Sequence, residues 1–221
     1  MNANLIIFGG TFDPPHQGHW DCLQQVHSQS PNSEIHVVPS YHPPVSSSLV
    51  KAPAASFDHR FEMCRIAFAN IPKTQITDVE KFLPTPSYTL QTLRHFKIQN
   101  PSLNISLLLG ADQVENFHQW HEPLSILEIA SLLLLPRKGF DLEPVVQNLL
   151  KTLQIRWVKR SEGRVDLESY RPIFMMDTSV TPAASRDIRN NLEKGLPVSK
   201  GWLNTRVVQY IHEHELYSFK K

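Results

Sequence analysis

Two histidines and three glycines stand close together near the start of the chain, in the run GGTFDPPHQGH at residues 9–19. His16 and His19 are three residues apart, so at the start of a helix both rings can project toward one anion. The amino terminus of that helix adds a partial positive charge. The two adjacent glycines are expected to turn the chain and expose amides to a phosphate, and Gly18 to admit a base or sugar. The run therefore predicts a local phosphate site.

Other interpretations of the histidine pair are open on these residues alone. A His-x-x-His pair can bind a metal ion, but no Cys, Asp or Glu stands beside it at ligand spacing, and two prolines restrict Asp13. The pair can also be ordinary polar surface at a helix start. The run contains neither G-x-G-x-x-G nor G-x-x-x-x-G-K-[ST], which removes the usual basis for dinucleotide-dependent hydride transfer and for P-loop hydrolysis.

Three polar positions further along follow apolar runs or open a helix. Asp112 comes after a run that ends in glycine, which suits hydrogen bonding to a ribose, although such an aspartate can equally cap the next helix. Arg137 comes just beyond the next apolar run. Ser185 can open a helix, and Arg189 would share its face, so a hydroxyl, free amides and a guanidinium can meet one anion.

Together these segments resemble the bacterial nicotinate-nucleotide adenylyltransferases, within the nucleotidyltransferase superfamily marked by H-x-G-H. Besides residues 9–19, the resemblance rests on PSYTLQTL at 86–93, LLGADQ at 108–113 with the following Trp120, and TPAASRDIR at 181–189. It implies an enzyme that joins ATP and nicotinate mononucleotide into deamido-NAD and pyrophosphate, a step of NAD biosynthesis. It also implies Mg²⁺ carried with ATP and no metal ligands from the protein.

The resemblance assigns roles to individual residues of this chain. The implied catalytic residues are His16, His19 and Arg189, which would bind the phosphates and stabilise the charge of the leaving pyrophosphate. The implied ATP-binding residues are Gly9, Gly10, Thr11, Phe12, Gly18, Ser185 and Ile188. The implied pyridine-nucleotide residues are Tyr88, Thr89, Asp112, Trp120 and Arg137, with the Trp120 ring stacked on the nicotinate.

The sequence also departs from the family pattern. Gln91 replaces the usual Asp of P-S-Y-T-x-D-T-L, and Lys138 interrupts R-P-G. Many relatives read P-P-H-K where this chain reads PPVS at residues 43–46, so the lysine on the ATP phosphates is missing; Lys51 or His42 are candidate substitutes. Three alternatives follow: a nicotinamide-mononucleotide adenylyltransferase, a pantetheine-phosphate adenylyltransferase, or a nucleotide-binding sensor without turnover.

The elements that must position these residues follow from apolar periodicity. Short apolar runs alternate with amphipathic stretches, which predicts an α/β fold: a Rossmann-like, mostly parallel sheet with helices on both faces, of the nucleotidyltransferase type. We expect a single domain over residues 1–221, with the polar segment 159–171 as a loop. The expected strands are 5–8, 35–38, 74–79, 105–109, 131–135 and 172–176; the expected helices are 18–28, 57–69, 185–192, 204–214 and one capped by Ser87 that runs to 99.

Composition limits the class of protein. The 22 Lys+Arg residues balance 21 Asp+Glu residues, so no broad basic field is available to hold nucleic acid. Cys22 and Cys64 lie far apart and outside any Cys/His cluster, which argues against a zinc or redox motif. The first residues lack a signal-peptide core and the apolar runs are too short to span a membrane, so we expect a cytoplasmic protein without membrane partners. The pattern leaves the oligomeric state open.

Overall fold

The computed structural model describes residues 4–44, 52–136, 141–161, 163–177 and 180–217. Its strands are β1 (Leu5–Gly10), β2 (Glu34–Pro39), β3 (Thr74–Ile76), β4 (Ile105–Gly110), β5 (Ala130–Leu135), β6 (Trp157–Ser161), β7 (Arg164–Leu167) and β8 (Ile173–Met175). Its helices are α1 (Gln17–Gln29), α2 (Phe57–Phe68), α3 (Thr89–Gln99), α4 (Ala111–Glu115), α5 (Pro123–Ile129), α6 (Leu142–Thr152), α7 (Ser185–Glu193) and α8 (Thr205–Glu213), with 3-10 helices η1 (Val79–Phe82) and η2 (Phe117–Gln119).

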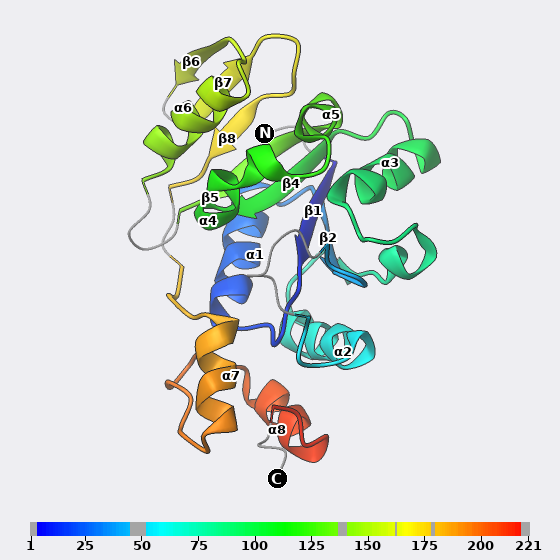
Figure 1. The fold of residues 1–221 in the computed structure, drawn as a ribbon, viewed down its shortest axis with the longest axis vertical. Coiled ribbons are helices and arrows are strands. Elements are labelled where there is room, and N and C mark those ends of the chain that lie inside the picture. Colours follow the sequence, from blue (N-terminus) through cyan, green and yellow to red (C-terminus); the bar gives the residue numbers. More distant parts are fainter. Residues whose placement is uncertain (1–3, 45–51, 137–140, 162, 178–179, 218–221) are drawn as a thin grey trace.

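The eight strands form one sheet in the order β3-β2-β1-β4-β5-β8-β7-β6 (Figure 1). From β3 to β8 all neighbouring strands are parallel, and only β7 and β6 are antiparallel to their neighbours. The strand order reverses direction between β1 and β4. In open parallel sheets, the loops at the carboxyl ends of the strands beside such a switch point form the ligand site.

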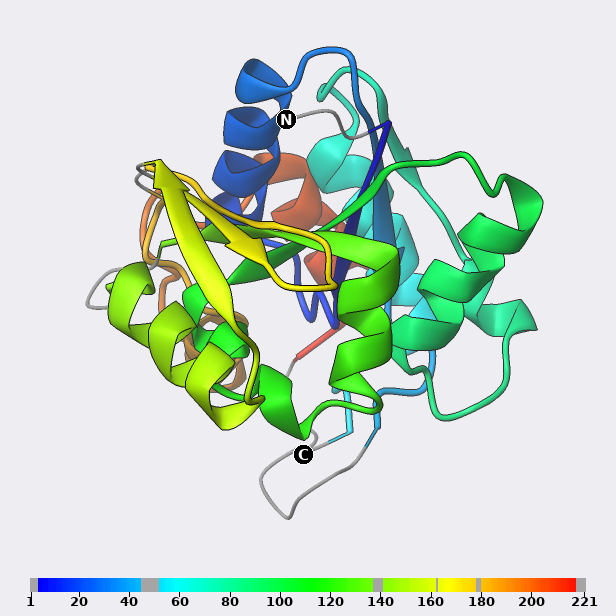
Figure 2. The same cartoon turned by 90° about the horizontal axis from the view of Figure 1, so that it is seen from above.

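Side chains of alternating direction bury both faces of the sheet. Leu5 and Ile7 of β1 pack in a core with α3, α5 and α6, whereas Ile6 and Phe8 pack in a second core with α1, α2 and α8. Figure 2 shows these helices on the two sides of the strands. The predicted α/β architecture with a mostly parallel sheet and helices on both faces is confirmed. No helix in the described part of the chain is both long and apolar enough to span a bilayer.

The predicted loop at residues 159–171 is wrong, because this segment contributes to the hairpin of β6 and β7 on the edge of the sheet. Its charged residues pair across the exposed face: Asp166 contacts Arg160 at 2.9 Å and Arg164 at 2.8 Å. Of the residues of this segment that the structure describes, only Val165 and Leu167 are buried. An antiparallel edge with one face in solvent needs few apolar residues, so its sequence resembles that of a loop.

The predicted cap of α3 is also wrong. Ser87 precedes the helix by two residues, the capping position is occupied by Tyr88, and no side chain caps the helix. Ser87 instead accepts a hydrogen bond from the backbone N–H of His42 at 3.0 Å. The hydroxyl thus joins the segment after β2 to the segment before α3. A tertiary partner has taken the acceptor that a local cap would have used.

Candidate active site

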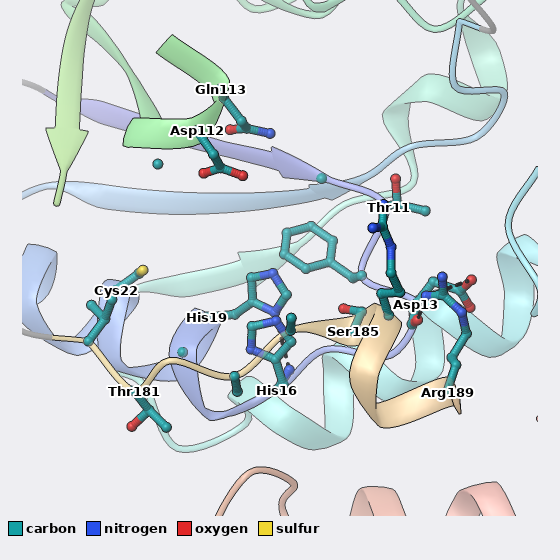
Figure 3. Close-up of a pocket in the computed structure, with 18 of the residues that line it drawn as sticks. Thr11, Asp13, His16, His19, Cys22, Asp112, Gln113, Thr181, Ser185 and Arg189 are labelled. Carbon is teal, nitrogen blue, oxygen red and sulfur yellow. Dashed lines mark hydrogen bonds and ion pairs between the residues drawn. The ribbon is translucent and has the colours of Figure 1, made fainter. Parts of the chain in front are cut away.

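A cavity of about 1130 Å³ opens at the carboxyl ends of β1, β4 and β5. The loop after β1, the start of α1, the start of α4 and the segment from 180 through the first turns of α7 all contribute to its wall. Figure 3 shows the two histidines beside each other, with Asp112 on one side of them and Ser185 and Arg189 on the other. The volume is above the usual range for a single small-molecule pocket, so the cavity has room for two nucleotides.

The helix start fixes the geometry of the histidine pair. His16 is the N-cap residue of α1 with an extended backbone, and His19 lies in the first turn. The two rings stack with centroids 3.7 Å apart and 20° between their planes. The backbone N–H of His16 donates to Nδ1 of His19 at 3.1 Å, so a neutral His19 carries its proton on Nε2. Phe8 and Phe12 pack edge-on against the His19 ring and hold its orientation.

Gly18 is required by the protein's own backbone. A Cβ at this position would lie 2.7 Å from the carbonyl oxygen of Thr181, closer than real Cβ contacts come. The Thr181 N–H donates to the Asp21 carboxylate at 2.8 Å, which fixes the segment before α7 against α1. The missing side chain of Gly18 therefore allows two distant parts of the site to touch.

The predicted turn at Gly9 and Gly10 is wrong. Both residues continue β1, where they lie opposite Val38 and Pro39 of β2, and neither has a positive φ. A left-handed backbone conformation occurs later, at Phe12, whose φ is 50°. The Phe12 ring is buried against other aromatic side chains, and this packing supports a backbone conformation that side-chain-bearing residues rarely adopt. A Cβ at Gly9 would meet nothing within 4 Å, so this glycine leaves the cavity floor open.

Helix α7 is joined to the loop after β1 by two side chains. The Ser185 hydroxyl donates to the carbonyl oxygen of Pro14 at 2.9 Å. Arg189 donates to the carbonyl oxygen of Asp13, and its Nη1 lies 3.6 Å from the Asp13 carboxylate. The structure therefore brings the histidines, the hydroxyl and the guanidinium to the wall of one cavity.

Asp13 is a buried carboxylate that joins several segments of the site, a role that the sequence did not reveal. Its carboxylate accepts from the backbone N–H groups of Ala54 and Ala55 at 2.7 and 3.1 Å, and from the hydroxyl of Tyr217 at 2.7 Å. Burial lowers the pKa of the nearby Arg60, and the charge of Asp13 opposes that shift. The position of an acid inside the GGTFDPPHQGH run is the one signal that could have indicated Asp13.

Arg60 has a structural role at the carboxyl edge of the sheet. Its guanidinium is almost fully buried and donates to three carbonyl oxygens: Ala55 at 3.2 Å, Thr11 at 2.8 Å and Ser40 at 2.8 Å. These belong to the loops after β1 and β2 and to the start of α2. One side chain thereby holds three segments at the carboxyl edge of the sheet.

Of the residues expected to bind the pyridine nucleotide, Asp112 lines the cavity, whereas Tyr88, Thr89 and Trp120 lie outside its lining. The Tyr88 ring stacks on His121 with centroids 4.2 Å apart, and Trp120 packs against Phe117 at 5.2 Å. Thr89 is the first residue of α3.

The remaining expected residues fall into two groups. Thr11 and Phe12 line the cavity, whereas Ile188 is fully buried in α7 and outside the lining. Arg137 lies outside the described residues, as do the family departures at 45, 46 and 138. Of the two candidate substitutes for the missing lysine, Lys51 also lies outside them, while His42 is exposed.

Comparison with known proteins identifies the family. The cytidylyltransferase-like family matches residues 7–191, a range that begins within β1 and ends within α7. A probable nicotinate-nucleotide adenylyltransferase of Hydrogenovibrio crunogenus is 32% identical over 222 residues, covering 98% of each chain. This chain belongs to the nicotinate-nucleotide adenylyltransferase family. A relative of the same name in Idiomarina loihiensis is 29% identical, covering 96% of this chain and 98% of its own.

A solved structure shares the family fold. The Plasmodium falciparum nicotinic acid mononucleotide adenylyltransferase complexed with NaAD superposes with a TM-score of 0.73 over 98% of both chains, at 19% identity. The nucleotidyltransferase-type fold is thereby confirmed, and the family model and the relatives confirm the predicted family.

Proposed function

We propose that this chain catalyses adenylyl transfer from ATP to nicotinate mononucleotide, giving deamido-NAD and pyrophosphate. The observation that carries the proposal is the meeting of His16 and His19 with Ser185 and Arg189 at one cavity, from elements far apart in the chain. The names of the relatives support the same reaction. A large cavity at the switch point of the sheet suits two nucleotides that must be held end to end.

Catalysis in this proposal is positioning and charge stabilisation. The phosphate of the mononucleotide is already ionised at neutral pH, so it can attack the α-phosphorus of ATP in line without a general base. The Nε2–H of His19 and the ring of His16 are the donors that we assign to the triphosphate. The start of α1 adds its dipole to these side chains. As pyrophosphate leaves, these groups stabilise the charge that develops on its oxygens.

We assign Arg189 and Ser185 to the same phosphates from the side of α7. Arginine suits this position because its planar fork can hold two phosphate oxygens. The Arg189 side chain is 27% exposed, so it reaches solvent in the cavity while its inner edge rests on Asp13. Asp112, on the far side of the histidines, is the described residue that we assign to the ribose of the second nucleotide.

Mg²⁺ enters this scheme as part of the substrate, bound to the phosphates of ATP. Within the described ranges there is no group of three or more His, Cys, Asp or Glu side chains that could hold a metal ion. Asp13, the most buried carboxylate at the cavity, is already engaged by two amides and a hydroxyl. A magnesium ion prefers phosphate oxygens and water over dedicated protein cages, which agrees with this arrangement.

The test is a coupled pyrophosphate assay with ATP and Mg²⁺ and one acceptor at a time. We expect pyrophosphate release that requires nicotinate mononucleotide and is at least tenfold less efficient with nicotinamide mononucleotide or phosphopantetheine. A preference for either of the other acceptors would replace the substrate while keeping the reaction. ATP binding without release for any acceptor would identify a sensor and refute the proposed function.

Neither Cys22 nor Cys64 forms a disulfide in the described part of the chain, which suits a reducing compartment, and we therefore propose a cytoplasmic enzyme. We also propose that the chain is one domain, because all eight described strands belong to one sheet.

A further inference from the structure

The last described residues fold back onto the nucleotide site. After α8, Glu215 and Tyr217 both have a positive φ, and the N–H of Leu216 bonds to the Ile211 carbonyl at 3.0 Å. These turns bring Tyr217 into the core beneath the loop that follows β1, where its ring is buried with Phe12. Its hydroxyl donates to Asp13 Oδ1 at 2.7 Å, across 204 residues of sequence.

Several groups contact the Asp13 carboxylate. Oδ2 accepts from Ala54 N at 2.7 Å, while Oδ1 accepts from Ala55 N at 3.1 Å and from Tyr217. Arg189 donates to the Asp13 backbone carbonyl and keeps Nη1 3.6 Å from Oδ2, which is longer than a tight ion pair. Because amides and the hydroxyl already satisfy the carboxylate, Arg189 retains donors for a second anion.

We propose that Tyr217 is a positioning residue of the nucleotide site, whose hydroxyl satisfies Asp13 and so keeps Arg189 available to the triphosphate of ATP. This inference rests on the proposed function for the identity of the ligand. Burial and the charge of Asp13 raise the pKa of Tyr217, so its hydroxyl keeps its proton and stays a donor at physiological pH. Without the hydroxyl, the carboxylate draws Arg189 inward, away from the phosphates.

Tyr217→Phe tests the inference because it removes the hydroxyl and keeps the ring. Binding of α,β-methylene-ATP with Mg²⁺ is measured by calorimetry, and KM for ATP and kcat by the pyrophosphate assay. We expect about tenfold weaker binding of the analogue, as for loss of one hydrogen bond to a buried charge, and a similar rise in KM for ATP. An unchanged affinity overturns the inference, even if the variant is less stable to heat.

Tyr210→Phe is the matched control. Tyr210 lies on α8, and its hydroxyl shares a hydrogen bond of 3.0 Å with Nδ1 of His59. It is outside the cavity lining, so the same atom is removed from the same part of the chain without touching Asp13. We expect an affinity within about twofold of the unmodified protein. An equal loss in both variants overturns the inference in favour of general destabilisation.

Two further comparisons test whether the effect of Tyr217 acts through Arg189 and keep the test valid if one variant folds poorly. In an Arg189→Ala background, Tyr217→Phe is expected to change affinity by less than about twofold, because its effect acts through Arg189; an undiminished effect overturns that route. Tyr217→Gln keeps a donor and Tyr217→Leu does not, so the glutamine variant should bind the analogue more tightly, and equal affinities overturn the inference. Because binding is measured without an acceptor, failure of the proposed reaction leaves these outcomes readable.

Discussion

At the scale of single residues, the site depends on rings and hydroxyls whose orientation is fixed by backbone groups. The His16 N–H fixes the tautomer of His19, and two phenylalanine edges fix its plane. A donor that is already oriented loses little entropy and needs no reorganisation when charge develops on a phosphate oxygen. This preorganisation is the physical basis for the role that we assign to His19.

Replacing His19 by alanine is expected to lower kcat by a factor of about 10²–10³, the usual cost of one preorganised donor to a developing anion. The fold should persist, since the ring lies in the cavity wall and is partly exposed. The measurement is pyrophosphate release at saturating substrates. His118→Ala is the control, because His118 lies outside the cavity lining; full turnover by a folded His19→Ala protein would contradict the assignment.

At the scale of elements, two contacts hold segments that the parallel sheet only brings near each other. Ser185 attaches α7 to the loop after β1. Glu80 of η1 accepts from the Tyr41 N–H at 3.0 Å and from the Thr92 hydroxyl at 3.2 Å, and so attaches the segment after β2 to α3. Each contact is formed by one side chain and can be tested by a substitution that removes a single group.

Replacing Ser185 by alanine is expected to lower the free energy of unfolding by about 1 kcal/mol, because the Pro14 carbonyl loses its donor. The start of α7 should also dock less firmly, so KM for ATP should rise. Chemical denaturation and steady-state kinetics measure the two effects. Ser125→Ala removes an equivalent hydroxyl from an exposed contact with Glu122 and should change neither quantity. A Ser185→Ala protein that is indistinguishable from this control would refute the role of the contact.

Glu80 gives a pH dependence of stability with a definite sign. Burial raises its pKa above the usual value of 4.5, and hydrogen bonds from Tyr41, Ser87 and Thr92 oppose the shift. The folded state therefore binds the proton more tightly than the unfolded state, so this group reduces stability as pH rises from about 4.5 through the folded pKa.

The Glu80→Gln variant isolates the contribution of Glu80 to the pH dependence of stability. Its stability relative to the unmodified protein should increase as pH rises from about 4.5 toward neutrality, measured by denaturation at several pH values. The comparison cancels the contribution of His36, whose pKa is lowered by burial and which therefore acts in the opposite direction. A stability difference that does not change with pH would contradict this account.

At the scale of the whole molecule, the cavity is assembled from the first strand, the middle of the sheet and the segment beyond β8. A ligand that spans these parts binds only the folded state, so it should raise the melting temperature. The prediction of a single domain over residues 1–221 stays a prediction, although one sheet with a core on each face agrees with it.

Removal of divalent metal should separate catalysis from stability. With excess EDTA, pyrophosphate release is expected to stop, while the melting temperature of the nucleotide-free protein stays the same, because Mg²⁺ is held by ATP in our proposal. Calorimetry with and without EDTA, followed by restoration of activity with Mg²⁺, measures both effects. A lower melting temperature in EDTA would indicate a metal bound by the protein itself.

The sequence by itself determined the parts that depend on neighbouring residues. The apolar runs predicted the central strands because parallel strands buried on both faces need continuous apolar side chains. The histidine spacing and helix start predicted that two rings meet at the amino terminus of α1, as they do with centroids 3.7 Å apart. Local geometry was sufficient for these results.

Only the tertiary structure decided which distant groups share a partner. The contacts of Asp13 with Arg189 and Tyr217 join residues 176 and 204 positions apart, and no local periodicity encodes them. The positive φ of Phe12 is supported by aromatic packing around its ring, and the charged edge hairpin depends on a neighbouring strand. Such features arise only when complete elements pack together, because the contacts between elements outweigh the local conformational preferences of the residues.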